Sequence, residues 1–155
     1  MALARRPTIA VLIAEGEKAL AGAGIGPARL EAEVLLAKSL GVPRTALILD
    51  PGSGVSDEAA QAFRTDVARR VTRYPLQYLT GVQEFHGLDF AVDARVLIPR
   101  PETEMIVDEV LRLARSRPVG PRIVDVGTGS GCIAVTLAVK LAGAVGRVGA
   151  TAAKY

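Results

Sequence analysis

The chain has 155 residues, of which 50% are hydrophobic and 23% are charged. This composition supports a folded core and excludes a disordered tail. Aromatic residues make up only 4%, and tryptophan is absent, which argues against a binder that stacks single-stranded bases on aromatic side chains. The net charge is +3, and the longest basic runs are the pairs Arg5-Arg6 and Arg69-Arg70. Direct nucleic-acid binding is therefore not expected.

The numbers of cysteine and histidine residues limit the kinds of site that the chain can contain. Cys132 is the single cysteine, which excludes an internal disulfide and suits a cytoplasmic protein. We expect Cys132 to pack in a helix and His86, the single histidine, to have a structural or surface role. No ligand set with metal-binding spacing is evident, so no metal is expected. The apolar residues 9–14 are interrupted at once by charged residues, so no membrane partner is expected either.

Residues 1–75 are predicted to form a small helical bundle. Thr8 can cap a helix that begins at Ile9 and ends near Ala21, and a second helix runs from Pro27 to Leu40 and ends at Gly41. A short helix over 44–49 and a fourth helix opened by Ser56 follow. The expected buried positions of the second and fourth helices are Ala28, Ala32, Leu35, Leu36, Ala60, Phe63, Val67 and Val71. The charged residues away from this apolar side are Arg64, Asp66, Arg69, Arg70 and Arg73, and the arginines of the fourth helix are expected to form a solvated face.

The pattern changes after Tyr74-Pro75. Residues 82–92 predict two short strands around Gly87, and residues 97–101 are expected to be extended, because proline disfavours helix at the residue before it. A further helix begins near Thr103. Its expected buried side consists of Ile106, Val110 and Leu113.

A glycine-rich turn dominates the last part of the chain. Residues 122–126 predict a short buried strand, which leads through Gly127, Gly129 and Gly131 into an apolar helix from about Cys132 to Leu141. Residues 147–151 predict the next strand. A strand, a glycine-rich turn and a helix in this order are typical of the opening of nucleotide-type cofactor folds.

Three interpretations of this turn are open on the residues alone. A dinucleotide fingerprint would need its third glycine where Cys132 stands. The observed G-x-G-x-G, with Asp125 before it, resembles instead the first motif of S-adenosylmethionine (SAM) methyltransferases. A glycine-rich turn without a ligand is the third possibility, and Asp125 would then cap the loop amides.

Two segments beside the turn point to one family. Pro75-Leu-Gln-Tyr-Leu-Thr-Gly81 with Glu84-Phe-His-Gly-Leu, and then Leu97-Ile-Pro-Arg-Pro-Glu-Thr-Glu104, precede D-x-G-T-G-S-G, and together they resemble the HemK/PrmC family. The resemblance implies a SAM-dependent methyltransferase that methylates the glutamine of the Gly-Gly-Gln motif in peptide chain release factors. It implies an α+β protein with a helical release-factor-binding domain (1–75), a linking β-hairpin (76–100) and an incomplete, Rossmann-like SAM domain (101–155).

The resemblance also assigns site residues. Those matching the SAM loop are Asp125, Gly127, Thr128, Gly129, Ser130 and Gly131. Those matching the segment beside the cofactor and the target glutamine are Pro99, Arg100, Pro101, Glu102 and Thr103. The residues alone permit a simpler interpretation of this segment, in which Glu102 and Glu104 favour a helix N-terminus and Thr103 helps to cap it.

The sequence departs from the family pattern in two places. Ala152 stands near the position of an acidic residue that binds the cofactor ribose, and the family's Asn-Pro-Pro-Tyr motif, which holds the glutamine amide, is absent. We therefore expect a fragment with no catalytic residue of its own, no transfer activity alone and a poorly stable SAM half. A non-catalytic release-factor-binding protein is the alternative. A nucleic-acid amino-methyltransferase is disfavoured by the scarce aromatics and by the Pro-Arg-Pro-Glu-Thr-Glu segment.

Overall fold

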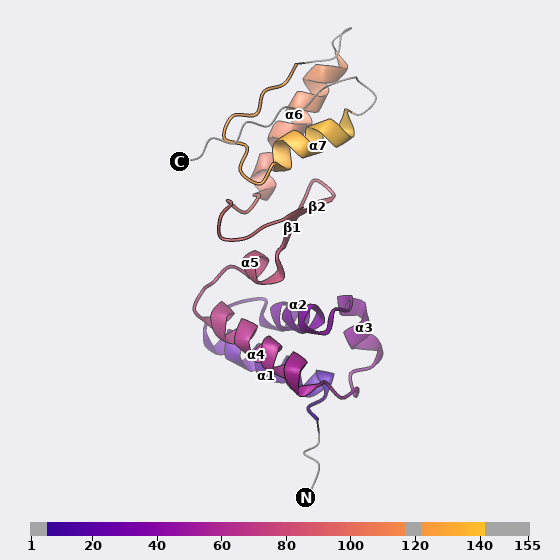
Figure 1. Cartoon of the computed structure of the whole chain (residues 1–155), viewed down its shortest axis with the longest axis vertical. Coiled ribbons are helices and arrows are strands. Elements are labelled where there is room, and N and C mark those ends of the chain that lie inside the picture. The colour runs from indigo at the N-terminus through magenta and orange to yellow at the C-terminus, as the bar shows by residue number, and fades with distance from the viewer. Residues whose placement is uncertain (1–5, 117–121, 142–155) are drawn as a thin grey trace, which may run out of the picture. The chain divides into compact units, whose positions relative to one another are not determined.

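The computed structural model describes residues 6–116 and 122–141. The chain divides into two compact units, Met1–Thr80 and Gly81–Tyr155 (Figure 1). The first unit is helical, and the second begins with a β-hairpin.

Unit 1 contains α1 (Ile9–Gly22), α2 (Ala28–Leu40), α3 (Arg44–Leu49), α4 (Asp57–Val71) and the short α5 (Leu76–Thr80). The hydroxyl of Thr8 accepts a hydrogen bond from the Val11 amide, and that of Ser56 accepts one from the Ala59 amide, as expected of N-caps. Gly41 ends α2 with φ +66°, a left-handed conformation that glycine adopts without steric cost. The predicted helices of this part of the chain are therefore confirmed.

Both ends of α1 are closed by other parts of unit 1. Its first amides, those of Ile9 and Ala10, donate to the carbonyls of Ser53 and Pro51 at 3.1 and 2.9 Å. At the other end, the Arg73 guanidinium donates to the Ala23 carbonyl at 2.7 Å. The loop before α4 and the residue after α4 thus satisfy polar groups that a helix leaves unpaired at its ends.

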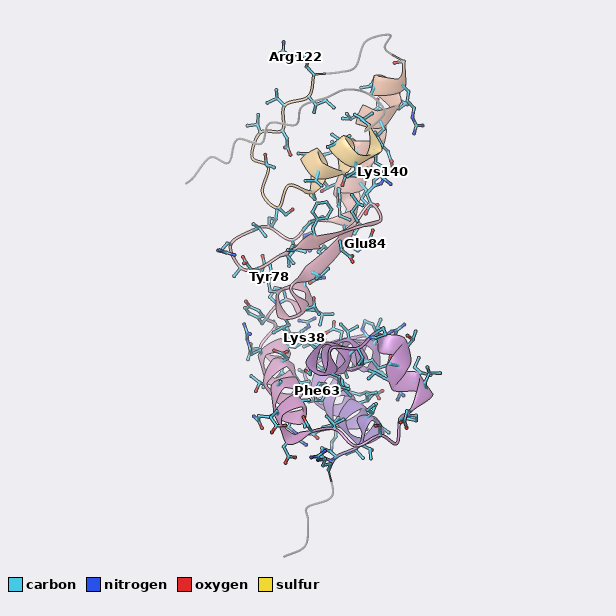
Figure 2. All side chains as sticks on the ribbon, turned by 45° about the vertical axis from the view of Figure 1, so that its right-hand side comes forward. Lys38, Phe63, Tyr78, Glu84, Arg122 and Lys140 are labelled. Atoms are coloured by element: carbon cyan, nitrogen blue, oxygen red, sulfur yellow. The ribbon has the colours of Figure 1, made fainter. Side chains whose placement is uncertain are left out.

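The core of unit 1 lies between α1, α2 and α4. The predicted apolar faces are confirmed: Ala32, Leu35, Leu36, Ala60, Phe63 and Val67 are buried, and Ala28 and Val71 pack against them. Figure 2 labels Phe63, which α4 directs into this core. Gly16 of α1 makes the close approach possible, because a Cβ at Gly16 would lie 2.6 Å from Phe63 Cζ.

The charged residues of α4 are not simply a solvated face. Asp66 is only 7% exposed, and its Oδ2 lies 2.6 Å from Lys38 Nζ of α2. The Arg70 guanidinium donates two hydrogen bonds to Glu31 of α2. The prediction of a solvated face was wrong for Arg70 because α2 presents the opposite charge of Glu31 where α4 packs against it.

Unit 2 opens with the antiparallel strands β1 (Val82–Phe85) and β2 (Leu88–Ala91), as predicted. The single turn of 3-10 helix η1 (Pro101–Thr103), α6 (Glu104–Arg115) and α7 (Cys132–Lys140) follow, and α6 packs beside α7. His86 and Gly87 connect the strands with φ +54° and +80°. Positive φ at both central residues is the requirement of a tight hairpin turn.

The buried side of α6 differs from the prediction. Val107 and Leu111 are buried, whereas Ile106 and Leu113 are 52% and 44% exposed; Val110 is partly buried. Helix α6 carries two apolar stripes, and periodicity cannot tell which of them meets a neighbour. The hairpin and α7 cover the stripe of Val107 and Leu111.

The predicted buried strand over 122–126 is not formed. Residues 122–125 have no regular secondary structure, Val126 forms only a single β-bridge, and Val124 and Val126 are 81% and 89% exposed. A buried strand needs neighbouring strands and covering helices, and among the described residues the only sheet consists of β1 and β2. The expected strand at 147–151 and Ala152 lie outside the described residues.

Candidate cofactor turn and the adjoining hairpin

The glycine-rich turn takes a backbone shape that requires its glycines. Gly127, Gly129 and Gly131 have φ of +77°, +57° and +80°, in the region that L side chains rarely adopt. The Gly131 amide donates to the Thr128 carbonyl at 2.9 Å, which closes the turn directly before α7. A side chain at any of these three glycines would therefore strain the turn.

Asp125 contributes an unsatisfied acceptor at the entry to the turn. Its backbone carbonyl accepts a hydrogen bond from the Thr128 hydroxyl at 3.1 Å. Its carboxylate oxygen Oδ2 is buried and has no hydrogen-bond partner among the described residues. Because no donor among them reaches it, this atom does not cap the described loop amides, and a buried acceptor left in this state is costly. It is suited to accept a hydrogen bond from a polar ligand.

The start of α7 adds donors to the same place. Gly131 occupies the N-cap position, and no side chain caps the helix. The first amides of a helix lack intrahelical acceptors and carry the positive end of its dipole. Cys132, the first residue of α7, is buried among apolar side chains, which confirms its predicted packing role.

The Pro99–Thr103 segment is anchored at both ends and exposed between them. Pro99 is buried, whereas Arg100, Pro101 and Glu102 are exposed. The Thr103 amide donates to the Arg100 carbonyl at 3.0 Å. Thr103 makes no side-chain capping bond to α6, so the prediction of a Thr103 cap was wrong; its φ and ψ are helical, which is not the geometry of a capping residue.

Contacts at the hairpin tip involve two acids that sequence reasoning did not assign to it. The His86 amide donates to Glu104 Oε1 at 2.9 Å, and His86 Nε2 lies 2.9 Å from Asp108 Oδ1. His86 thus has the structural role expected of it. The sequence does show that Glu104 and Asp108 are four residues apart and therefore lie on one side of the helix. It does not show that His86, which is 18 and 22 residues away from them, contacts that side.

The site segments meet through the core of unit 2. Among the described residues, no hydrogen bond or ion pair joins residues 99–103 to residues 125–131. However, Cys132 at the end of the glycine turn shares one buried cluster with Val107 of α6 and Phe85 of the hairpin. The structure therefore places the turn and the start of α6 against common apolar side chains.

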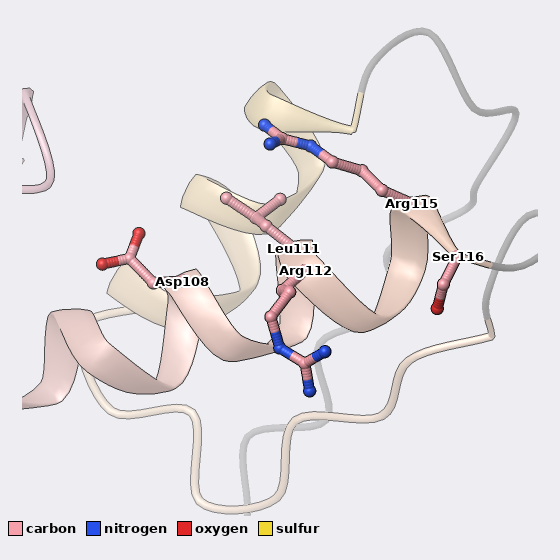
Figure 3. A pocket seen from close by; sticks show the side chains of 5 residues that line it. All are labelled: Asp108, Leu111, Arg112, Arg115 and Ser116. Atoms are coloured by element: carbon pink, nitrogen blue, oxygen red, sulfur yellow. The ribbon is translucent and has the colours of Figure 1, made fainter.

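A shallow pocket of about 460 Å³ lies along the later turns of α6. It is lined by Asp108, Leu111, Arg112, Arg115 and Ser116. Figure 3 shows Arg112 and Arg115 extending in different directions from the helix, and Arg112 is engaged by Glu109 at 2.6 Å. The side chains do not converge on a common point, so this pocket is not a built binding site.

The described ranges 6–116 and 122–141 hold neither a metal-binding cluster nor a helix that could span a membrane. No group of three or more His, Cys, Asp or Glu residues there is arranged to hold a metal ion. None of the helices formed by these residues has the length and apolar character needed to cross a membrane.

Comparison with known proteins relates the chain to one family. The sequence profile described as the PrmC N-terminal domain matches residues 12–81. A release factor glutamine methyltransferase of Geobacter sulfurreducens is 50% identical over 122 residues, which are 79% of this chain and 42% of the relative. Proteins of the same name from Nitratidesulfovibrio vulgaris and Chlorobaculum tepidum are 44% and 48% identical, over 84% and 75% of this chain and 43% and 41% of their own lengths.

The chain thus spans less than half the length of these relatives. The matched residues of unit 1 include most of α1 and all of α2, α3, α4 and α5. The alignments of 120 to 130 residues are longer than unit 1, so they continue into unit 2. These matches confirm the resemblance of the chain to the HemK/PrmC family.

Proposed function

We propose that this chain is part of a SAM-dependent protein-glutamine methyltransferase whose substrate is the Gly-Gly-Gln glutamine of peptide chain release factors. The observation that carries the proposal is the glycine turn, where a buried Asp125 oxygen with no partner among the described residues lies at the entry to a helix start that no side chain caps. The names of the relatives support the choice of substrate. In this proposal, unit 1 binds the release factor.

The residues of the turn fit the cofactor by their chemistry. Asp125 would accept a hydrogen bond from a cofactor donor, and Gly127, Gly129 and Gly131 would let the backbone approach the cofactor closely. Thr128 and Ser130 lie between these glycines. The bound cofactor supplies a methyl group activated by its positive sulfur, and the protein's part is to orient the glutamine nitrogen toward that methyl group.

The Pro99–Thr103 segment would contribute to that orientation. Buried Pro99 and the turn closed by the Thr103 amide restrict the backbone. They leave Arg100 and Glu102 exposed to a ligand. For the 155-residue chain alone we expect cofactor binding without transfer, because the Asn-Pro-Pro-Tyr motif is not among its residues.

A second candidate function is release-factor binding without catalysis. It is favoured by a contrast between the two units. Unit 1 has a large core and hydrogen-bonded helix ends, whereas Val124 and Val126, before the cofactor turn of unit 2, are exposed. Methylation of nucleic-acid amino groups has no comparable support. A cytoplasmic location stays a prediction.

Calorimetric titration of SAM into the 155-residue chain tests the proposal. Saturable binding is expected, and Asp125→Ala should weaken it by about tenfold, the effect of losing one hydrogen bond to a charged acceptor. Glu109→Ala is the matched control, because within the described ranges the Glu109 carboxylate hydrogen-bonds to Arg112 of its own helix and to no other residue. No binding by a folded chain would contradict the cofactor site and favour the non-catalytic alternative.

A further inference from the structure

Two acidic side chains of α6 hold the tip of the hairpin. Glu104 accepts a hydrogen bond from the backbone amide of His86, and Asp108 contacts the His86 ring, both at 2.9 Å. The acids are four residues apart, so they project from the same side of α6. The sequence alone assigned Glu104 to the electrostatics of a helix start, and nothing in the proposed chemistry uses the hairpin contact.

The hairpin tip has little freedom to adjust. His86 and Gly87 both have positive φ, and the Gly87 amide donates to the Glu84 carboxylate within the same hairpin. On its inner side, Phe85 is 1% exposed and shares a buried cluster with Val107. The first turns of α6 are therefore fixed against the hairpin by an apolar contact and by a polar one.

This anchoring extends to the segment before α6. Glu104 directly follows Thr103, whose amide donates to the Arg100 carbonyl. At the other end of the segment, Pro99 is buried. The contact of Glu104 with the hairpin therefore restrains the C-terminal end of the Arg100–Thr103 turn. This turn carries the exposed side chains of Arg100 and Glu102.

We propose that Glu104 is a positioning residue. Its carboxylate docks the hairpin tip on α6 and thereby sets the direction in which the Arg100–Thr103 turn faces a ligand. The His86–Asp108 contact is a secondary tether. The identity of that ligand rests on the proposed function, whereas the positioning itself is a property of unit 2.

Three variants separate positioning from helix electrostatics. Glu104→Gln keeps an oxygen that can accept the His86 hydrogen bond but removes the charge that favours a helix N-terminus. Glu104→Ala removes both the oxygen and the charge. His86→Gly keeps the amide and the left-handed turn and removes only the ring. Glu109→Ala again serves as the control on the same helix.

The measurement is amide hydrogen exchange at His86 and Thr103 in the 155-residue chain. We expect exchange at both amides to accelerate by about tenfold or more in Glu104→Ala. It should change by less than about threefold in Glu104→Gln and in His86→Gly. The affinity of the chain for SAM should fall more in Glu104→Ala than in Glu104→Gln or His86→Gly.

Several results would overturn the inference. Equal acceleration in Glu104→Gln and Glu104→Ala would assign Glu104 to helix electrostatics, and equal acceleration in His86→Gly would make the ring the main tether. Acceleration at His86 without acceleration at Thr103 would leave a local contact with no positioning effect. If Glu104→Ala unfolds unit 2, the Glu104→Gln variant decides the question. Slow amide exchange at His86 and Thr103 in that variant would support the inference, and fast exchange would overturn it. Absent SAM binding would count against the proposed function and not against these exchange results.

Discussion

The ion pair between Glu31 of α2 and Arg70 of α4 offers a quantitative test of the packing in unit 1. The side chains are 11% and 17% exposed, and Arg70 Nε and Nη2 donate to the two carboxylate oxygens at 2.6 and 3.1 Å. Arg70→Ala would leave the Glu31 charge buried without its partner. Breaking a buried pair in this way costs about 3–5 kcal/mol.

That cost is large for a unit of this size. A folded unit of roughly 80 residues has a total stability of about 4–12 kcal/mol. Arg70→Ala should therefore remove about a quarter or more of it, whereas the double variant Glu31→Met with Arg70→Leu should cost much less because no charge remains buried. The assay is urea unfolding of the 155-residue chain, followed by circular dichroism of its helices.

The control compares this pair with an exposed one. Arg64→Ala removes the partner of Glu15, and because both of these side chains are nearly half exposed, it should cost less than about 1 kcal/mol. Equal losses in Arg70→Ala and Arg64→Ala would refute the reasoning. So would a double variant as unstable as Arg70→Ala.

Two further changes test other contacts. Gly16→Ala should destabilise the chain by about 1 kcal/mol in urea unfolding, because its Cβ would lie 2.6 Å from Phe63 Cζ. Gly22→Ala, with no atom near the added Cβ, should be neutral or stabilise the chain by up to about 1 kcal/mol. The reverse order of stability would contradict the close approach of α1 and α4. Hydrogen bonds from Arg95 lower the pKa of Asp93 from 3.8 to about 2, so this interaction is fully present above pH 3.8 and is lost as the pH falls through about 2. In Arg95→Ala, NMR titration should find the Asp93 pKa closer to 3.8, and an unchanged pKa would contradict the contact.

Helices α1 to α4 of unit 1 were predictable because their signals are local. Thr8 and Ser56 mark helix starts, Gly41 marks an end, and the spacing of Leu35 and Leu36 identifies a buried face. Each of these signals depends on residues within a few positions along the chain. The hairpin around Gly87 was predictable for the same reason, since a turn that needs positive φ selects glycine.

The errors occurred where a neighbour distant in the sequence decides the outcome. Periodicity found an apolar stripe on α6 but chose Ile106 in place of Val107, because only the packed hairpin and α7 determine which stripe is covered. The run of residues 122–126 has the composition of a strand, yet Val124 is exposed, because strand formation depends on pairing partners.

The sequence by itself determined the positions of α1 to α4, the hairpin, the glycines of the turn and the resemblance to the HemK/PrmC family, since each depends on residue types at short spacings. Only the tertiary structure decided the partners: that Arg70 pairs with Glu31, that one buried Asp125 carboxylate oxygen has no partner in the described part of the chain, and that Glu104 holds the His86 amide. Such pairings join residues that are distant along the chain, and they form only after the apolar cores have brought their elements together.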